Sequence, residues 1–288
     1  MPTTTIRPHA RRRAAIAATF PLTLGAAPAF AQESINVPAP TQPGEGRFTI
    51  AERMRYLRLG DDPTDQNRDR IDQFEFITNL QYGLTGDVAL SFDLPVVVRD
   101  IGYEDRGGRT LEGIGDMTAL VKWRAWQHDF GPVDTMRIGL SAGVRIGSGH
   151  SGVSDSDVDP VVGAAYMLIT GRHGLNIAAD WTFTTGGEDH PVMPGDGESD
   201  LLRAGAAWLY RIIPDAYTAE TNASWYTVLE LTANYETNGD HEMFLAPGLL
   251  YEARRWAAEI SLLIPVSENL DNRPETTIGV VAGVRFLF

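Results

Sequence analysis

The chain has 288 residues, 38 acidic against 24 basic side chains, a net charge of −14 and no cysteine. The lack of cysteine excludes disulfide and thiol chemistry, and so acidic a chain is not expected to bind nucleic acid. After residue 31 no apolar stretch approaches the ~20 residues that a transmembrane helix needs, which excludes a helical membrane protein but allows a β-barrel.

Residues 1–31 have the features of an export signal. A run of arginines is followed by the apolar residues 14–27 and by an Ala-Phe-Ala cleavage motif at 29–31. We therefore predict a signal peptide over residues 1–31, cleaved before Gln32. A membrane anchor is the alternative, but the apolar stretch is short and is interrupted by Pro21.

Residues 32–47 are rich in proline and glycine, which predicts an extended periplasmic linker or a plug segment. From Phe48 onward, apolar and polar residues alternate in strand-like segments, most of them long enough for one crossing of a membrane by a tilted strand. We expect twelve such strands, at approximately 48–58, 70–82, 86–99, 114–127, 134–147, 158–169, 174–184, 200–212, 224–236, 241–252, 255–266 and 276–288.

The last segment alternates strictly between a wholly apolar face and a mixed face. An open sheet edge of this kind would aggregate, whereas a lipid-facing strand that closes against the first strand of a barrel would not. Phe286 and Phe288 are typical of the carboxyl-terminal assembly signal of outer-membrane barrels. The mixed face, expected to point inward, consists of Thr277, Gly279, Val281, Gly283, Arg285 and Leu287.

The connections alternate between tight turns and longer polar loops, which is the barrel pattern of short periplasmic turns and long external loops. The segment 213–223 is a long exception on the short side. Together with the even strand number, this rhythm predicts an all-β fold: a transmembrane antiparallel β-barrel over residues 48–288, an up-and-down meander with both ends in the periplasm. A soluble sandwich or closed barrel would also alternate, but the many Gly, Ser and Thr residues on the polar faces favour a wet lumen.

Charged residues on the expected inner faces are distributed unevenly. Basic side chains come from the fourth and fifth segments and acidic ones from the ninth to the eleventh, which are opposite walls of a twelve-stranded barrel. One hypothesis is a transverse field across a water-filled pore; the alternative is a set of interior ion pairs that brace the wall or close the lumen. The lumen-lining candidates are Lys122, Arg124, Arg137, Arg145, Glu230, Glu242, Glu252, Glu259 and Arg285.

Catalytic and metal-binding signals are weak. The acidic loops, such as the run 154–159, could hold calcium, but that run lacks the full EF-hand pattern. The histidines show no metal-ligand spacing, and no nucleophile elbow or phosphate loop occurs. A lipid-hydrolysing barrel would need a neighbouring Ser and His, and the candidates are Ser224 and His241. We therefore expect no enzyme activity, no cofactor and no metal.

Two glycine-rich motifs carry a resemblance. Gly113-Ile-Gly-Asp116 opens a strand, and Gly147-Ser-Gly leads through an Asp/Ser run to Asp159-Pro160 and Gly163. With the terminal Phe288, these motifs resemble the outer-membrane barrels of the MetA-pathway family, which is linked to phenol degradation. The resemblance implies a channel or transporter for small organic solutes, with aromatic compounds among them, and no catalytic residues.

We therefore expect passive or facilitated diffusion of small solutes through a charged lumen in the bacterial outer membrane. The expected partners are outer-membrane lipid, lipopolysaccharide, the barrel-assembly machinery and the solute itself. Two alternatives remain open. One is a non-conducting structural or surface-interaction barrel whose lumen is filled by side chains or by residues 32–47, and the other is a barrel enzyme that acts on lipid.

Overall fold

The computed structural model describes residues 32–64, 66–150 and 152–288; the predicted signal peptide lies outside the described residues. Within the described ranges all regular structure is β, and no helix is long and apolar enough to cross a membrane. The strands are β1 (Phe48–Gly60), β2 (Arg68–Gly83), β3 (Val88–Tyr103), β4 (Arg109–Ile114), β5 (Met117–Asp129), β6 (Thr135–Ile146), β7 (Val158–Thr170), β8 (His173–Thr182), β9 (Leu201–Ile213), β10 (Ala223–Glu236), β11 (His241–Ala253), β12 (Trp256–Asn269) and β13 (Glu275–Leu287).

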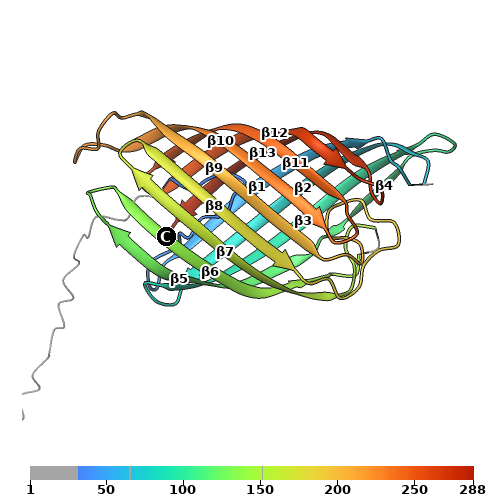
Figure 1. Ribbon diagram of the computed structural model, residues 1–288, viewed down its shortest axis with the longest axis horizontal. Coiled ribbons are helices and arrows are strands. Elements are labelled where there is room, and N and C mark those ends of the chain that lie inside the picture. The colour runs from blue at the N-terminus through green and yellow to red at the C-terminus, as the bar shows by residue number, and fades with distance from the viewer. Residues whose placement is uncertain (1–31, 65, 151) are drawn as a thin grey trace, which may run out of the picture.

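The strands form one closed antiparallel barrel in meander order (Figure 1). Each strand pairs with its neighbours in sequence, and β1 pairs with β13 to close the sheet, so no edge is left for aggregation. β4 and β5 are two pieces of one wall strand, because both pair with β3. β5 pairs with residues 88–93, the first half of β3, and β4 pairs with residues 96–101, in its second half. The barrel therefore has twelve wall strands, as the alternation predicts.

The break in the fourth wall strand has a local cause. Pro95 of β3 lies opposite the break, and proline has no N–H group to donate to a neighbouring strand. Gly115 donates its backbone N–H to the Pro95 carbonyl at 3.0 Å, and Asp116 then leaves the ladder before β5 begins. The sequence prediction of an unbroken strand at 114–127 and of a loop at 100–113 is thus wrong, because β3 continues to Tyr103 and β4 pairs with it.

The two ends of the barrel sheet meet at the end of the barrel that carries the short turns. Phe48 N–H donates to the Phe288 carbonyl at 3.3 Å, Phe288 N–H donates to the Phe48 carbonyl at 2.9 Å, and the two rings stack with centroids 4.8 Å apart. We call this the turn end; it lies at the left in Figure 1. The opposite, loop end carries the longer connections, including residues 147–157 and 183–200.

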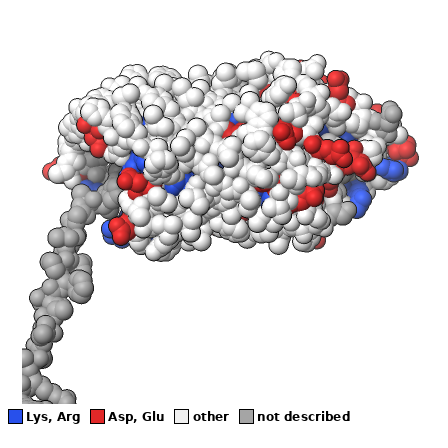
Figure 2. Space-filling view, turned by 60° about the horizontal axis from the view of Figure 1, so that its bottom comes forward, with Lys and Arg blue, Asp and Glu red and all other residues white. Residues whose placement is uncertain are grey.

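The outer face of the barrel is apolar. Along β12 and β13, residues such as Ile260, Leu262 and Phe286 are exposed while their neighbours in sequence are buried. Figure 2 shows a broad, mostly uncharged band between two charged ends, with acidic residues gathered at the loop end. Aromatic residues near the strand ends are exposed on this surface, among them Tyr82, Trp123, Phe183, Trp208, Trp225, Tyr235 and Trp256.

One detail of the last strand differs from the strict alternation. A β-bulge occurs where Arg58 pairs with Ile278 but Leu59 pairs with Thr276, so one residue of β13 has no partner. Thr276 is buried and bonds to Glu242 inside the barrel, whereas Thr277 is exposed. The expected inward position of Thr277 is therefore wrong, because the bulge shifts the phase of the strand by one residue.

Candidate functional site

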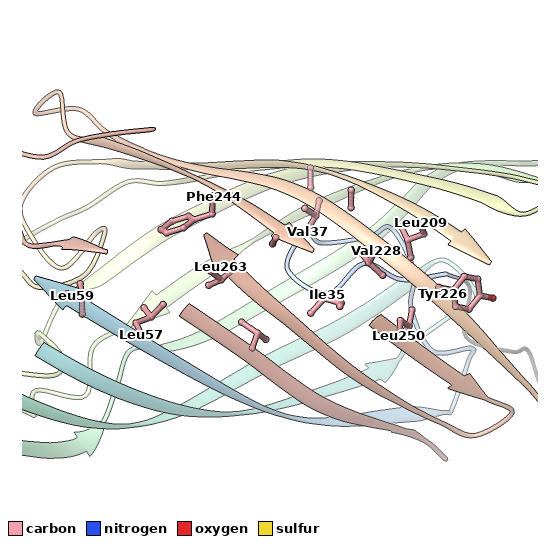
Figure 3. Packing of buried hydrophobic residues seen from close by; sticks show 14 of the residues in the cluster. Ile35, Val37, Leu57, Leu59, Leu209, Tyr226, Val228, Phe244, Leu250 and Leu263 are labelled. Carbon is pink, nitrogen blue, oxygen red and sulfur yellow. The ribbon is translucent and has the colours of Figure 1, made fainter. Parts of the chain in front are cut away.

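Residues 32–47, which we call the N-terminal segment, enter the barrel lumen. The segment lies beside the turn end at Gln32, rises to Glu230 and Gly205 in the middle of their strands, and returns to the turn end. There, Gly46 N–H donates to the Gly83 carbonyl at 2.9 Å. Figure 3 shows Ile35 and Val37, which form the apex of this path, between side chains of the barrel wall.

Glu230 of β10 holds the apex of the segment. Its carboxylate is fully buried and accepts the backbone N–H groups of Ile35 at 2.9 Å, Asn36 at 3.0 Å and Val37 at 3.4 Å. The Asn36 side-chain amide also donates to this carboxylate and to Ser261 Oγ. Three consecutive backbone donors around one carboxylate form an anion-binding turn, which satisfies both the charge and the buried backbone.

The two arms of the segment have further polar contacts with the wall. Asn176 of β8 donates to the Gln32 carbonyl at 3.3 Å and to Ser34 Oγ at 2.9 Å. On the other arm, Lys122 Nζ donates to the Thr41 carbonyl at 3.1 Å. Contacts from β5, β8 and β10 therefore anchor the segment on several walls.

Glycines in the wall provide the space that the segment occupies. A Cβ atom on Gly139 would lie 2.7 Å from Pro40 Cβ, and one on Gly205 would lie 2.8 Å from Val37 Cγ2. Contacts this short are not tolerated, so both positions must lack a side chain for the segment to fit. Both glycines face the lumen, so the wall and the segment are complementary in shape.

The predicted lumen charges are buried or half-buried in the interior, where most of them have specific partners. Glu259 pairs with Arg53 at 3.0 Å and with Arg285 at 3.2 Å, and Arg285 also pairs with Glu33 of the N-terminal segment. Glu242 pairs with Arg273 at 3.1 Å. Interior pairing of this kind is the alternative that the sequence left open, and the transverse field stays a prediction.

The remaining basic candidates divide between the two ends of the barrel. Arg124 lies at the turn end, where it pairs with Asp87 at 2.8 Å. Arg137 is half-buried on the neighbouring strand, and its Nε has no hydrogen-bond partner. Arg145 lies at the loop end and pairs with Asp159 at 2.6 Å. Arg145 is thus separated from Lys122, Arg124 and Arg137, which lie on the adjacent strands β5 and β6 in the half of the barrel toward the turn end.

Four arginines at the loop end, the mouth arginines Arg68, Arg99, Arg145 and Arg273, fix the external loops. Arg99 donates to the Gly152 carbonyl at 2.7 Å, and Arg145 donates to the Gly195 carbonyl at 2.6 Å. These bonds hold the loops 147–157 and 183–200 over the mouth. Val192 from the second loop is buried in the apolar interior.

The two glycine-rich motifs that carry the family resemblance meet at this mouth. Ser154 Oγ donates to Asp116 Oδ1 at 2.5 Å, and Asp116 lies 3.7 Å from Arg145. A Cβ atom on Gly113 would lie 2.8 Å from the His150 side chain. The motifs therefore serve the packing of the loops against the broken fourth strand.

An apolar surface also lines the lumen, and sequence reasoning missed it. It runs from the loop end to the turn end along β1–β3 and β8–β13, and Figure 3 shows part of it. Ile35 and Val37 of the N-terminal segment pack into its middle. We call it the apolar track; its larger members are Leu57, Leu59, Ile71, Ile101, Leu209, Tyr226, Val228, Phe244, Leu250, Leu263 and Val281.

One charged group at the mouth is strongly perturbed. Burial raises the pKa of Asp196 in the loop 183–200 to about 7, and the nearby Asp116 and Glu188 also raise it, whereas Arg99 lowers it. Asp196 Oδ2 accepts the Met193 N–H at 3.2 Å and lies 3.6 Å from Arg99. The docking of this loop is therefore expected to depend on pH near neutrality.

The structure assembles no catalytic or metal centre from the sequence candidates. Ser224 and His241 lie at opposite ends of their paired strands, since Ser224 is opposite Glu252 and His241 is opposite Tyr235, so they cannot act together. Within residues 32–288, apart from 65 and 151, no group of three or more His, Asp or Glu side chains is arranged to hold a metal ion.

The comparisons with known proteins concern the fold. No protein-family model and no curated protein matches the chain. An outer membrane channel from Pseudomonas putida F1 superposes with a TM-score of 0.54 at 14% identity, over 86% of this chain and 97% of that one. The transport unit of the Escherichia coli autotransporter AIDA-I gives 0.47 at 10% identity, over 88% and 94%, and the β-domain of a Bordetella autotransporter gives 0.44 at 15% identity, over 85% and 100%. The closed meander and its similarity to the Pseudomonas putida F1 channel show that the chain has the fold of an outer-membrane β-barrel.

Proposed function

We propose that this protein is an outer-membrane channel for small organic solutes, aromatic compounds among them, and that the N-terminal segment must be displaced for solutes to pass. The observation that carries the proposal is the apolar track, which continues from the mouth to the turn end inside a closed, lipid-facing barrel. A barrel that served only as a membrane anchor would not need a continuous apolar surface on its inner wall.

The polar side of the lumen complements the track. Arg53, Glu75 and Asp93 project inward from β1–β3, next to Lys122 of β5. A solute with an apolar body and one polar group, such as a phenol, could slide along the track while it exchanges hydrogen bonds with the polar side. The outer-membrane channel from Pseudomonas putida F1 with the same fold is compatible with this role.

A second function is favoured by a specific observation. In the described conformation the N-terminal segment fills the middle of the lumen, and its backbone N–H groups at Ile35 and Asn36 donate to the buried Glu230. A barrel permanently filled in this way would be a non-conducting structural or surface-interaction protein. The two functions differ in whether the segment can leave.

The test is a liposome-swelling series with sugars, amino acids and phenolic compounds. The double variant Ser34→Cys, Asn176→Cys is designed to form a disulfide that links the segment to β8, because Ser34 Oγ and Asn176 Nδ2 now lie 2.9 Å apart. The chain has no other cysteine. We expect uptake of phenolics by the wild type, loss of uptake in the oxidised variant and recovery with a reductant. Equal uptake by the oxidised and reduced variant would show that the segment does not gate the barrel.

The track itself is tested with Phe244→Asn, which places an amide in the apolar wall. We expect a slower uptake of phenolics relative to sugars. Ile264→Val on the lipid-facing side of β12 is the matched control, since it changes an apolar residue that does not face the lumen. If the wild type admits no solute, and a variant that lacks residues 32–41 admits none either, the non-conducting function is favoured.

A further inference from the structure

Glu252 of β11 is a buried carboxylate without a counter-ion. It is 5% exposed, its Oε1 accepts no hydrogen bond, and no basic side chain in the described part of the chain forms an ion pair with it. The other inward acids on this wall are compensated differently: Glu242 and Glu259 each pair with arginine, and Glu230 accepts three backbone N–H groups. A buried charge that lacks such compensation is strongly unfavourable.

Two neutral groups donate to the Glu252 carboxylate, the Tyr226 hydroxyl and the backbone N–H of Gln32, and the charged group that faces it is another acid, Glu259. Gln32 is fixed in this position from two sides. Asn176 donates to the Gln32 carbonyl at 3.3 Å. The Gln32 side chain lies over Gly174, where an added Cβ atom would come within 2.6 Å of Gln32 Oε1. The nitrogen of Gln32 is therefore held toward Glu252 by contacts on both sides.

Gln32 is also the first residue after the predicted Ala-Phe-Ala cleavage motif at 29–31. Hydrolysis of the 31–32 peptide bond adds one water, leaves a carboxylate on residue 31 and releases a protonated α-amine on Gln32. The neutral N–H donor would thus become an ammonium group with three donors at the atom that already contacts Glu252.

We propose that the α-ammonium of Gln32, created by removal of the signal peptide, is the counter-ion of Glu252 and anchors the start of the N-terminal segment inside the barrel. The proposal rests on the predicted cleavage site and is independent of solute transport. It also bears on a common modification of amino-terminal glutamine, in which the α-amine attacks the side-chain Cδ, forms the α-N–Cδ bond and expels ammonia. An amine held as ammonium against Glu252 is a poor nucleophile, so this cyclisation should be slow.

The chain offers a clean assay because Lys122 is its one lysine. The mature protein would have two amines, and reductive methylation with ¹³C-formaldehyde would give one NMR signal for each. Intact mass and terminal peptides identify the first residue. For the wild type we expect a mature chain that starts at Gln32. The pKa of its α-amine should be higher than that of a free amino terminus, which is about 7.7–8.0.

Glu252→Gln should lower the pKa of the α-amine, because the buried ammonium group loses its counter-ion. Glu242→Gln, a buried acid of the same strand that contacts Arg273 near the loop end, is the matched control and should leave that pKa unchanged. If Glu252→Gln does not fold, insertion of one alanine before Gln32 moves the amine away while Glu252 stays, and should have the same effect.

Three results would overturn the proposal. A terminus blocked by loss of ammonia would show that no ammonium exists there. An α-amine with the same pKa in the wild type and in Glu252→Gln would show that the two groups do not interact. A mature chain that starts at another residue would remove the premise of cleavage before Gln32 while leaving the channel function untouched.

Discussion

Replacing Glu230 with glutamine should release the apex of the N-terminal segment. The carboxylate accepts the N–H groups of Ile35 at 2.9 Å and Asn36 at 3.0 Å, and more weakly that of Val37 at 3.4 Å. A hydrogen bond to a charged group contributes about 1.5–3 kcal/mol and a neutral one about 0.5–1.5 kcal/mol, so each of the two shorter bonds loses roughly 1 kcal/mol. The glutamine NH₂ group also replaces an acceptor with a donor, which faces the same N–H groups.

Part of this loss is offset because the variant no longer buries a charge. The unfavourable contact between the glutamine NH₂ group and the backbone N–H groups acts in the opposite sense. With these two contributions taken as equal, the net weakening is about 2 kcal/mol, which raises the population of barrels with a displaced apex by about 30-fold. Single-channel recording in a planar bilayer measures this directly as the fraction of time spent open. Deletion of residues 32–41 gives the fully released reference.

Glu242→Gln is the matched control for this experiment. It removes the same charge from a buried position on the adjacent strand, where the partner is Arg273 rather than the N-terminal segment. An open probability in Glu230→Gln equal to that of the wild type, with a conducting deletion variant, would refute the role of Glu230 as the clamp. An equal rise in both glutamine variants would show that lumen charge matters rather than the contact with the segment.

Three further predictions concern the wall, the mouth and the barrel seam. Gly139→Ala should push Pro40 out of its recess and raise the open probability, because the new Cβ would lie 2.7 Å from Pro40 Cβ, and adding Pro40→Gly should restore the wild-type value in the same recordings. Burial raises the pKa of Asp196 to about 7, so the loop 183–200 should be most firmly docked at acidic pH and should loosen as pH rises through about 7. Protease cleavage of the loop should therefore become faster with rising pH in the wild type and should not depend on pH in this way in Asp196→Asn. The same pH profile in both proteins would contradict the role of Asp196. Phe288→Ala should lower the fraction of heat-resistant folded barrel on gels by removing the ring that stacks on Phe48, whereas an unaltered fraction would argue against a role in assembly or closure.

The correct parts of the prediction depend on local periodicity. Ile138, Leu140 and Ile260 face outward and Gly139 and Ser261 face inward, as the alternation indicates, because a strand repeats every two residues wherever it lies. The exceptions occur where the ladder is irregular. A bulge moves Thr276 inward in place of Thr277, and Pro95 on a neighbouring strand breaks the fourth wall strand.

The positions of the interior groups were predicted less well than their direction. Sequence reasoning placed Glu230, Glu252 and Glu259 on the inner face but could not assign their partners, which come from residues far away in the chain. It also gave no role to Arg53, Asn176 and Arg273, whose contacts depend on closure of the barrel. The one available signal for the inserted segment was the alternating series of apolar residues Ile35, Val37 and Ala39 in a stretch otherwise typical of a linker.

The sequence by itself determined a twelve-stranded barrel with an apolar outside, a mixed inside and both ends of the sheet on one side. Those properties follow from alternation and loop length, which each segment carries within its own few residues. Only the tertiary structure decided that the N-terminal segment occupies the lumen, because Ile35 and Glu230, 195 residues apart, meet only after the sheet has closed. The same closure joins the apolar residues of separate strands into one track and leaves Glu252 facing Gln32, and neither arrangement has a periodic signature along the chain.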